Sequence, residues 1–452
     1  MLAAPRPLVK ESPEAPRAPS AADEQLERVI GPWGLGANAV NTAIGGGIFV
    51  MPGLVAALLG PAAIMAYLLC AVAMVLVLTC FAEIGTLVRR SGGPVAYIEE
   101  AFGPLAGFLA WIIYSVGFVT VASAAIANVL VDALAIVIPS LTHGVGRVAA
   151  LFLMFSLLAA INIVGVRQGM RLSVGTTVAK LVPLMFVIVG GVFVMHWREL
   201  QWTGWPSTAA LGEGTLLIFF AFQGLEEALC PSGEIKDPAR TVPLAIFGAV
   251  GALIFVYVAL QVVSQGVLGS DLGRQTSTPL AEVAARIAGP QGRVLMLVGV
   301  TLSIFGCLAA GMIQNPRSFF LMAQNGMLPS ALARVHPRFH TPHVAIVTVA
   351  ALTFLIAATG AFRHLAILSS ASSLSVYLAI CLSALRLRYT RKRVAGAFRA
   401  PGGPIVGILG AAFVIWILSF TTRLEFGALA ATVALGSAYY YLRQRLRPAA
   451  IS

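Results

Sequence analysis

Long apolar runs separated by short polar segments make up most of the chain, for example residues 60–79, 101–121 and 148–163. A membrane-spanning helix needs about 20 consecutive, mainly apolar residues, so runs of this length predict that the chain crosses a membrane many times. The pattern predicts about twelve spans, near residues 32–58, 61–87, 103–136, 147–166, 171–196, 211–233, 241–268, 292–323, 343–361, 364–386, 404–422 and 425–442.

The composition agrees with lipid rather than water as the main solvent, because 58% of the 452 residues are apolar and 11% are charged. A net charge of +12 can indicate a nucleic-acid partner. Here, however, the basic residues lie between apolar runs instead of on one polar domain. We therefore expect a lipid bilayer around the protein and no nucleic acid among its partners.

The basic residues also predict the orientation of the chain. Most of the 30 Lys and Arg residues lie before the first predicted span and in alternate loops after it. Under the positive-inside rule these segments are cytoplasmic, which places both termini in the cytoplasm and the protein in the cytoplasmic (inner) membrane. Residues 1–30 are rich in Pro, Ala and Glu and have no apolar core, so they are expected to be a disordered cytoplasmic tail.

Glycine interrupts two of the predicted spans. Gly45, Gly46 and Gly47 follow one another in the first, and Gln223-Gly224 lies in the sixth. Each glycine lowers helix stability by roughly 1 kcal/mol relative to alanine, which favours a break within the membrane. Backbone N–H groups freed at the start of a half-helix bind carboxylate well. Close packing of helices through small residues is the alternative explanation of the same glycines.

The two interruptions fall at corresponding places if residues 31–196 and 197–390 are two repeats of five helices. Repeats with an odd number of spans enter the membrane from opposite sides and are therefore inverted. The expected fold is an all-α membrane protein with a 5+5 inverted-repeat core, broken helices one and six, and two extra helices in residues 391–452. The C-terminus is expected to be cytoplasmic.

A motif in and after the sixth span carries a family resemblance. This stretch resembles the amino acid-polyamine-organocation superfamily of permeases, which has F-x-G-x-E in that span and E-x-K-x-P-x-R-x-x-P behind it; the matching residues are Phe222, Gly224, Glu226, Glu234, Lys236, Pro238, Arg240 and Pro243. The superfamily's signature between the second and third spans is similar to Ala82–Thr86, Ser91–Gly93, Tyr97 and Ala101–Pro104. The resemblance covers residues 31 to about 390 and implies an amino acid substrate.

The resemblance also implies which residues form the substrate site. The N–H groups of Gly45, Gly46 and Gly47 would hold the substrate carboxylate. Its ammonium group would bind carbonyl oxygens of Ala43, Ile44, Phe220, Ala221 and Gln223. Phe220 would also be an aromatic gate, unless it simply faces lipid. The side-chain pocket would be lined by Gly117, Phe118, Ala122, Ala125 and Gly311.

This predicted pocket is roomy and apolar. Relatives that select arginine or agmatine have an amide or acid in the third span and tryptophan in place of Gly311. The pocket therefore weakly favours a neutral amino acid, unless Glu226 or Glu227 provides a counter-charge for a cationic one. Adjacent helical residues point about 100° apart, so at most one of these two glutamates is expected to face the site.

Lys180 is the one lysine within a predicted span. A charge there costs at least about 2.5–3.5 kcal/mol, so it needs a partner or a function. Lys180 resembles a fifth-span lysine that, in a proton-coupled branch of the family, lies where sodium-dependent relatives bind sodium. Ser303 or Cys307 is expected beside it. A fixed structural ammonium is the alternative, and Glu83 is expected to pair with arginines near its end of the second span.

The predicted function is therefore an amino acid permease that works by alternating access and needs no cofactor. Transport is expected to be sodium-independent and either proton-coupled or exchanging. The residues expected to act in coupling or gating are Lys180, Phe220, Glu226 and Glu227. A cationic amino acid or polyamine antiporter is the alternative within transport. A membrane enzyme is disfavoured because the sequence shows no metal-ligand cluster and no nucleophile–base pair. The sequence leaves open the particular substrate, the coupling ion, the direction of flux and the oligomeric state.

Overall fold

The computed structural model describes residues 30–88, 92–164, 169–202, 204–229, 235–391 and 397–446. All regular elements in these ranges are helical, and the sole β-type pairing among them is an isolated parallel bridge between Ile30 and Ile235. The all-α prediction is thus confirmed. The predicted tail apart from Ile30, and the motif residues Ser91 and Glu234, lie outside the described residues.

The helices of the first half follow the predicted apolar runs. They are α1 (Pro32–Ala43), the short η2 (Gly47–Phe49), α2 (Met51–Leu59), α3 (Ala63–Leu87), α4 (Gly93–Phe102), α5 (Pro104–Ile112), the π-helix η4 (Ile113–Thr120), α6 (Val121–Ala135), α7 (Gly144–Val164) and α8 (Gly169–Val192). The first predicted span is therefore interrupted, as α1, η2 and α2.

The second half of the chain is also helical. It consists of α9 (Thr208–Phe222), the 3₁₀-helix η7 (Leu225–Leu229), α10 (Pro238–Leu268), α11 (Pro279–Gln324), α12 (His343–Thr359), α13 (Phe362–Thr390), α14 (Pro404–Leu418) and α15 (Arg423–Leu446). Non-helical backbone at Ala288 and Gly289 divides α11, so the predicted span 292–323 corresponds to its longer second part.

Seven helical stretches among the described residues are long and apolar enough to cross a membrane: Met51–Leu87, Pro104–Ala135, Gly144–Val164, Thr208–Leu229, Pro238–Arg274, Pro279–Gln324 and Phe362–Thr390. Three apolar helices are shorter: Lys180–Val192, His343–Thr359 and Pro404–Leu418. These lengths support a chain that crosses the membrane repeatedly. The count of about twelve spans and the inverted relation of the halves stay predictions.

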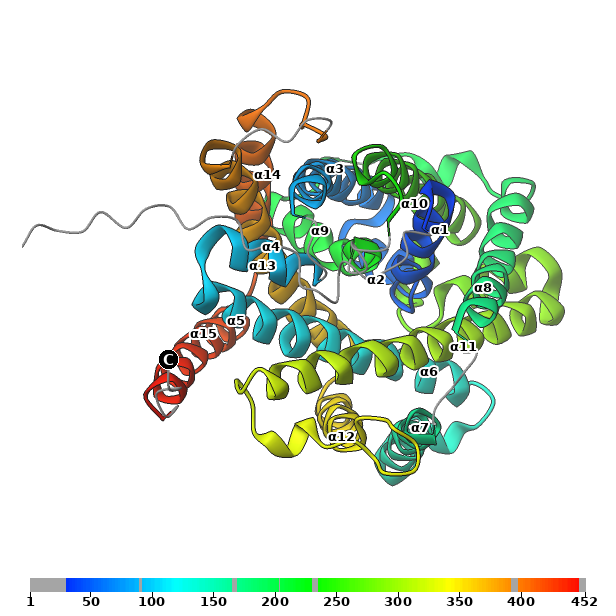
Figure 1. The fold of residues 1–452 in the computed structure, drawn as a ribbon. Coiled ribbons are helices and arrows are strands. Elements are labelled where there is room, and N and C mark those ends of the chain that lie inside the picture. The colour runs from blue at the N-terminus through cyan, green and yellow to red at the C-terminus, as the bar shows by residue number, and fades with distance from the viewer. Residues whose placement is uncertain are drawn as a thin grey trace, which may run out of the picture.

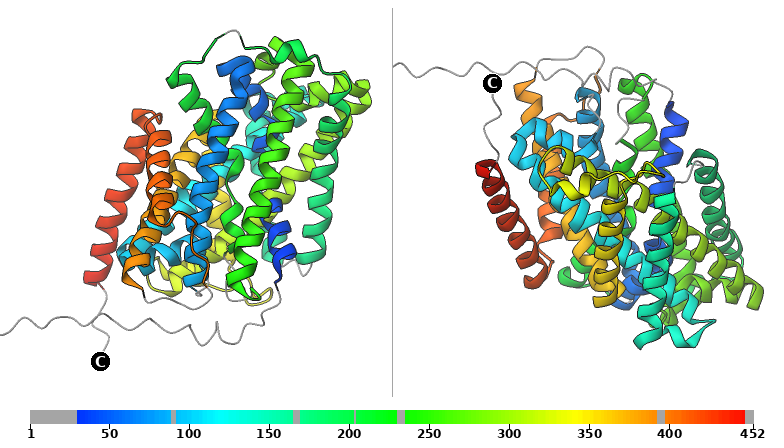
Figure 2. Two further views of the ribbon diagram at one scale, coloured as in Figure 1. Left: turned by 90° about the horizontal axis from the view of Figure 1, so that it is seen from above. Right: turned by 60° about the horizontal axis from the view of Figure 1, so that its bottom comes forward.

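The helices form a bundle in which most run roughly along one direction (Figure 2). Figure 1 shows α1, α3, α9 and α10 as one group, and α10 packs against both α1 and α3. Elsewhere α11 packs against α8 and α6, and α12 packs against α7. The last helix, α15, lies at the periphery, where it contacts α5 and α13. The interrupted helices are therefore in the interior of the bundle.

The two interruptions lie against each other, and each is marked by a residue with non-helical backbone angles. Ile44, directly after α1, has a ψ of 82°, which is outside the helical range. Gly224 has a φ of +98°, a conformation that side chains disfavour, so glycine is required there. The hydroxyl of Thr42 donates to Gly224 O at 2.9 Å, and this hydrogen bond joins the end of α1 to the break after α9.

Candidate functional site

The break after α1 exposes a row of backbone donors. Gly45 N donates to Ala43 O at 2.8 Å, and the amides of Phe49 and Val50 donate into η2. The N–H groups between them, of Gly46, Gly47 and Ile48, donate none of the backbone hydrogen bonds found in the described breaks and loops. Three successive free N–H groups ahead of α2 form a concave donor set suited to a carboxylate.

The carbonyl oxygens predicted to bind the substrate ammonium group differ in how many hydrogen bonds they already accept from the protein. Ala43 O accepts from Gly45 N and from the Tyr257 hydroxyl, at 3.3 Å. Ile44 O accepts from Lys180, at 2.9 Å. Ala221 O accepts one hydrogen bond, from Tyr257 at 2.9 Å. A carbonyl oxygen has two lone pairs, so Ala221 O keeps a free acceptor position and Ala43 O does not.

Tyr257 of α10 is a site residue that the sequence reasoning missed. Its side chain is completely buried, and its hydroxyl lies between Ala43 O and Ala221 O. One hydroxyl therefore connects the break after α1 to the end of α9. The available sequence signal was a tyrosine inside an apolar span, because a buried hydroxyl needs a hydrogen-bond partner.

Removing this hydroxyl should impair transport. Tyr257→Phe leaves Ala221 O without its partner, at a cost of about 1 kcal/mol, so we expect roughly fivefold slower uptake. Tyr67→Phe is the matched control, because Tyr67 is also completely buried and its hydroxyl has no partner among the described residues. Initial uptake rates and melting temperatures of both variants measure the effect; equal losses would mean that Tyr257 acts only through packing.

Lys180 of α8 contacts the same break from the other side. Its ammonium group donates to Asn41 O and Ile44 O, both at 2.9 Å, and lies 3.6 Å from the sulfur of Cys307. The side chain is 1% exposed. Of the two expected neighbours, Cys307 contacts Lys180, whereas the hydroxyl of Ser303 is buried without a partner in the described structure. A buried cation thus holds the carbonyl end of α1 against α8 and α11.

The glycines of the break are tightly enclosed. A Cβ atom on Gly46 would lie 2.9 Å from Ile126 Cβ and 3.0 Å from Ile304 Cγ1. On Gly47 it would lie 2.7 Å from a ring carbon of Phe220. All three distances are shorter than normal carbon–carbon contacts of about 3.5–4.0 Å. By contrast, a Cβ on Gly45 would meet only Cys307 Sγ, at 3.9 Å.

Phe220 belongs to this enclosure and does not face lipid. It is 7% exposed, and its ring lies edge-on against Phe362 at a centroid distance of 5.4 Å. Its proximity to Gly47 is compatible with a gate between the site and one side of the membrane. That role stays a prediction.

The residues of the predicted side-chain pocket lie on η4, α6 and α11, and a serine of α13 lies next to them. Gly117 approaches Ser372, whose Oγ would be 2.7 Å from an added Cβ, while Phe118 is 4% exposed. Ala122 is partly exposed, as is Gly311 of α11. The atom facing Gly311 is Ser123 Oγ, 3.6 Å from the Cβ position. The wall of the predicted pocket therefore carries a hydroxyl group that the expectation of an apolar pocket did not include.

The two glutamates after the second break differ in their surroundings. Glu226 is completely buried and accepts hydrogen bonds from Gly224 N, at 3.1 Å, and from the hydroxyl of Tyr377. The ring of Tyr377 packs edge-on against Phe219 at 5.4 Å. Glu227, in contrast, is partly exposed. Glu226 is thus the more enclosed of the two glutamates.

Gln223 and Glu83 are held by polar contacts of their own. Gln223 donates to Ser370 Oγ at 3.1 Å and accepts from Ser369 at 3.2 Å, so α13 fixes its side chain. Glu83 forms an ion pair with Arg388 at 3.3 Å, which confirms the expectation of an arginine partner. This pair does not involve the glycine break.

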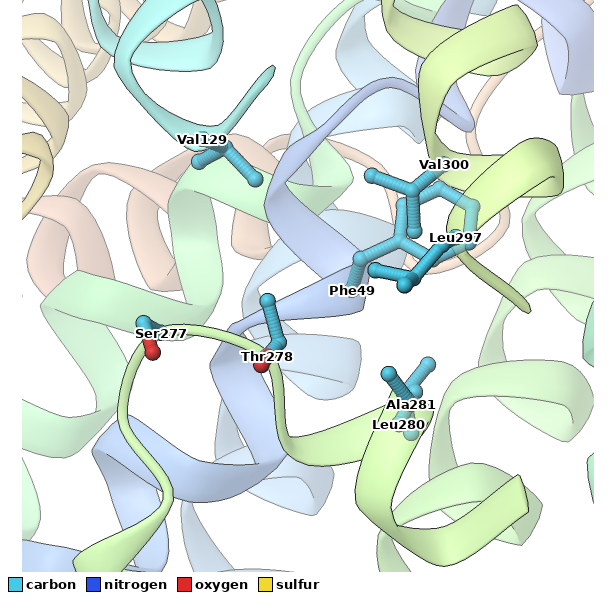
Figure 3. A pocket seen from close by; sticks show the side chains of 8 residues that line it. All are labelled: Phe49, Val129, Ser277, Thr278, Leu280, Ala281, Leu297 and Val300. Atoms are coloured by element: carbon cyan, nitrogen blue, oxygen red, sulfur yellow. The ribbon is translucent and has the colours of Figure 1, made fainter. Parts of the chain in front are cut away.

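A separate apolar cavity lies beyond the break. It is small, with a volume of about 10 Å³, which is room for roughly one water molecule, and it is lined by Phe49, Val129, Ser277, Thr278, Leu280, Ala281, Leu297 and Val300. Figure 3 shows the loop residues Ser277 and Thr278 on one side of it and Phe49 with Val300 on the other. None of the predicted substrate-binding residues lines this cavity.

An interrupted helix pair around free amides, inside a bundle of long apolar helices, is the architecture of a membrane carrier. Comparison with known proteins specifies which kind. The profile of the amino acid permease family matches residues 30–429. The chain belongs to this family, which confirms the resemblance to the amino acid-polyamine-organocation superfamily. It is therefore a multi-pass membrane protein, and membership places it among transporters rather than enzymes.

Several curated relatives match over nearly their whole length. The serine/threonine exchanger SteT of Bacillus subtilis is 29% identical, over 94% of this chain and 98% of the exchanger. The branched-chain amino acid permease BcaP of the same organism is 24% identical, over 95% of both chains. A methylthioribose transporter, also from Bacillus subtilis, is 27% identical over 97% of this chain and 98% of the transporter.

Proposed function

We propose that the protein is a secondary active transporter that moves a neutral amino acid across the cytoplasmic membrane by alternating access. The observation that carries this proposal is the run of free N–H groups at Gly46, Gly47 and Ile48, enclosed by buried side chains. In such surroundings a substrate carboxylate supplies the hydrogen-bond acceptors that these N–H groups otherwise lack. Phe220 O, Gln223 O and the free lone pair of Ala221 O are the acceptors for its ammonium group.

The cycle we propose is sodium-independent and either proton-coupled or exchanging. Lys180 supports it, because its ammonium group already supplies a positive charge to the carbonyl oxygens of Asn41 and Ile44, which are the kind of oxygen ligands that a sodium ion would bind. Glu226, buried with one carboxylate oxygen unpartnered among the described residues, is the second coupling candidate. Both termini are placed in the cytoplasm, in keeping with the basic loops.

A neutral substrate is supported by the surroundings of the break and by the relatives. The side chains nearest to Gly46 are isoleucines, and the one facing Gly311 is a serine, so no counter-charge for a cationic side chain stands at these positions. The substrates in the names of two relatives, serine and threonine for the exchanger and branched-chain amino acids for the permease, are neutral as well.

Purified protein in proteoliposomes tests the proposal. Uptake of labelled amino acids should be driven by an imposed pH gradient or by exchange for an amino acid preloaded inside the vesicles. The rate of uptake should be the same with sodium or choline outside. Neutral amino acids should compete, whereas lysine, arginine and agmatine should not. Competition by these cations would favour the antiporter alternative. If no amino acid is transported and none raises the melting temperature, the transport proposal is wrong.

A further inference from the structure

A π-helical segment changes which residues of α6 face the substrate site. Residues Ile113–Thr120 form a π-helix between α5 and α6. A π turn contains one residue more than an α turn, so the residues that follow are rotated by about 100° relative to a continuous α-helix. The segment is built into the fold, because Asn315 of α11 donates to Ser115 O at 3.2 Å and to Thr120 Oγ1 at 3.0 Å.

With this rotation a serine and an isoleucine of α6 lie beside glycines of the site. The family resemblance, counted along the chain from Gly103-Pro104, places Ala122 and Ala125 at the site. In the structure the residues one position later, Ser123 and Ile126, are the ones that lie against glycines of the site. Ile126 lies against Gly46 at 2.9 Å from its Cβ position, and Ser123 faces Gly311.

The hydroxyl of Ser123 is free to bind a ligand. The side chain is partly exposed although it lies in the interior of the bundle, and it makes no hydrogen bond with the described part of the chain. Nearby hydroxyls are engaged: Thr120, for instance, donates to Ser115 O at 2.7 Å. Gly45 is partly exposed as well, and it lies beside Cys307, one turn of α11 from Gly311.

We propose that Ser123 hydrogen-bonds the side chain of the transported amino acid and that the substrates are small neutral amino acids with a hydroxyl group, such as serine and threonine. This assignment rests on the proposed transport function. A serine hydroxyl both donates and accepts, so it can pair with a substrate hydroxyl in either direction. Ile126 and Ile304 close the space at Gly46 and limit the length of the side chain.

Threonine and valine provide the sharpest test, because they have nearly the same shape and differ by one hydroxyl. One additional hydrogen bond predicts that threonine competes for uptake about tenfold better than valine in the parent protein. In Ser123→Ala the ratio should fall to about twofold or less, through weaker competition by threonine and little change for valine. Ser123→Thr keeps a hydroxyl and should keep the preference.

Ser383→Ala is the matched control. Ser383 is a completely buried serine of α13 whose hydroxyl donates within its own helix, to Ala379 O at 2.7 Å. Its replacement should leave the threonine-to-valine ratio unchanged. Monodispersity in detergent and thermal shifts by each amino acid separate binding from folding for all variants.

The outcomes distinguish this assignment from the transport function on which it rests. A parent protein that neither transports nor binds any amino acid contradicts the proposed function. Transport with equal use of threonine and valine, or with a preference for valine, overturns the role of Ser123 alone. So does an unchanged ratio in Ser123→Ala. If Ser123→Ala does not fold, the threonine-to-valine ratios of the parent protein and of Ser123→Thr still test whether Ser123 binds the substrate hydroxyl.

Discussion

Lys180→Ala should reduce amino acid uptake at least about thirtyfold. The substitution leaves Asn41 O and Ile44 O without their donor in a buried environment. Each unpaired buried acceptor costs about 1–3 kcal/mol, and 2 kcal/mol corresponds to about thirtyfold in a rate or an equilibrium constant. The end of α1 would then lose its attachment to α8, so the break would no longer hold its donors in place.

Lys236→Ala is the matched control for this variant, because Lys236 is an exposed lysine outside the site. It should transport at close to the parental rate. Lys180→Arg keeps a charge that cannot be released, so it should fold but lose accumulation driven by a pH gradient. Undiminished proton-driven accumulation by Lys180→Ala contradicts a proton relay through this residue. A strict sodium requirement in the parent protein contradicts the broader idea that Lys180 replaces a metal cation.

The positions of the helices could be predicted from the sequence because the length of an apolar run directly determines where a helix is buried in lipid. The predicted range 61–87 compares with Ala63–Leu87 in the structure, and 404–422 with Pro404–Leu418. The glycine breaks were predictable for a similar reason, since local backbone propensity alone disfavours a helix there.

The π-helix was not predictable from the sequence, and we infer that it shifts by one position the residues of α6 that face the side-chain pocket. Apolar residues fill Ile113–Thr120 in a way that fits an α-helix equally well. What stabilises the wider turn is the amide of Asn315, which is 200 residues away in sequence from Ser115. The same limit applies to Tyr257, whose partner Ala43 is 214 residues away.

A graded loss across the three glycines is the second large effect that we expect. Gly46→Ala and Gly47→Ala should each lower uptake at least about a hundredfold, and the leucine variants should abolish it. An added methyl group at Gly46 collides with Ile126 Cβ, an atom close to its backbone that cannot move aside, and overpacking costs about 1–3 kcal/mol. Displaced N–H groups would also lose their hydrogen bonds to the carboxylate, at about 1.5–3 kcal/mol each.

Gly45→Ala should lower uptake by less than about threefold, because its methyl group makes only an ordinary contact with Cys307 Sγ at 3.9 Å. Gly248→Ala, at a position of α10 with no atom within 4 Å, controls for the substitution itself. Uptake rates and substrate-induced thermal shifts of the four alanine variants give the comparison, with detergent monodispersity as the measure of folding. Parental uptake by a folded Gly46→Ala or Gly47→Leu variant would remove the carboxylate site from this break, and equal losses at all three glycines would reduce their role to helix packing.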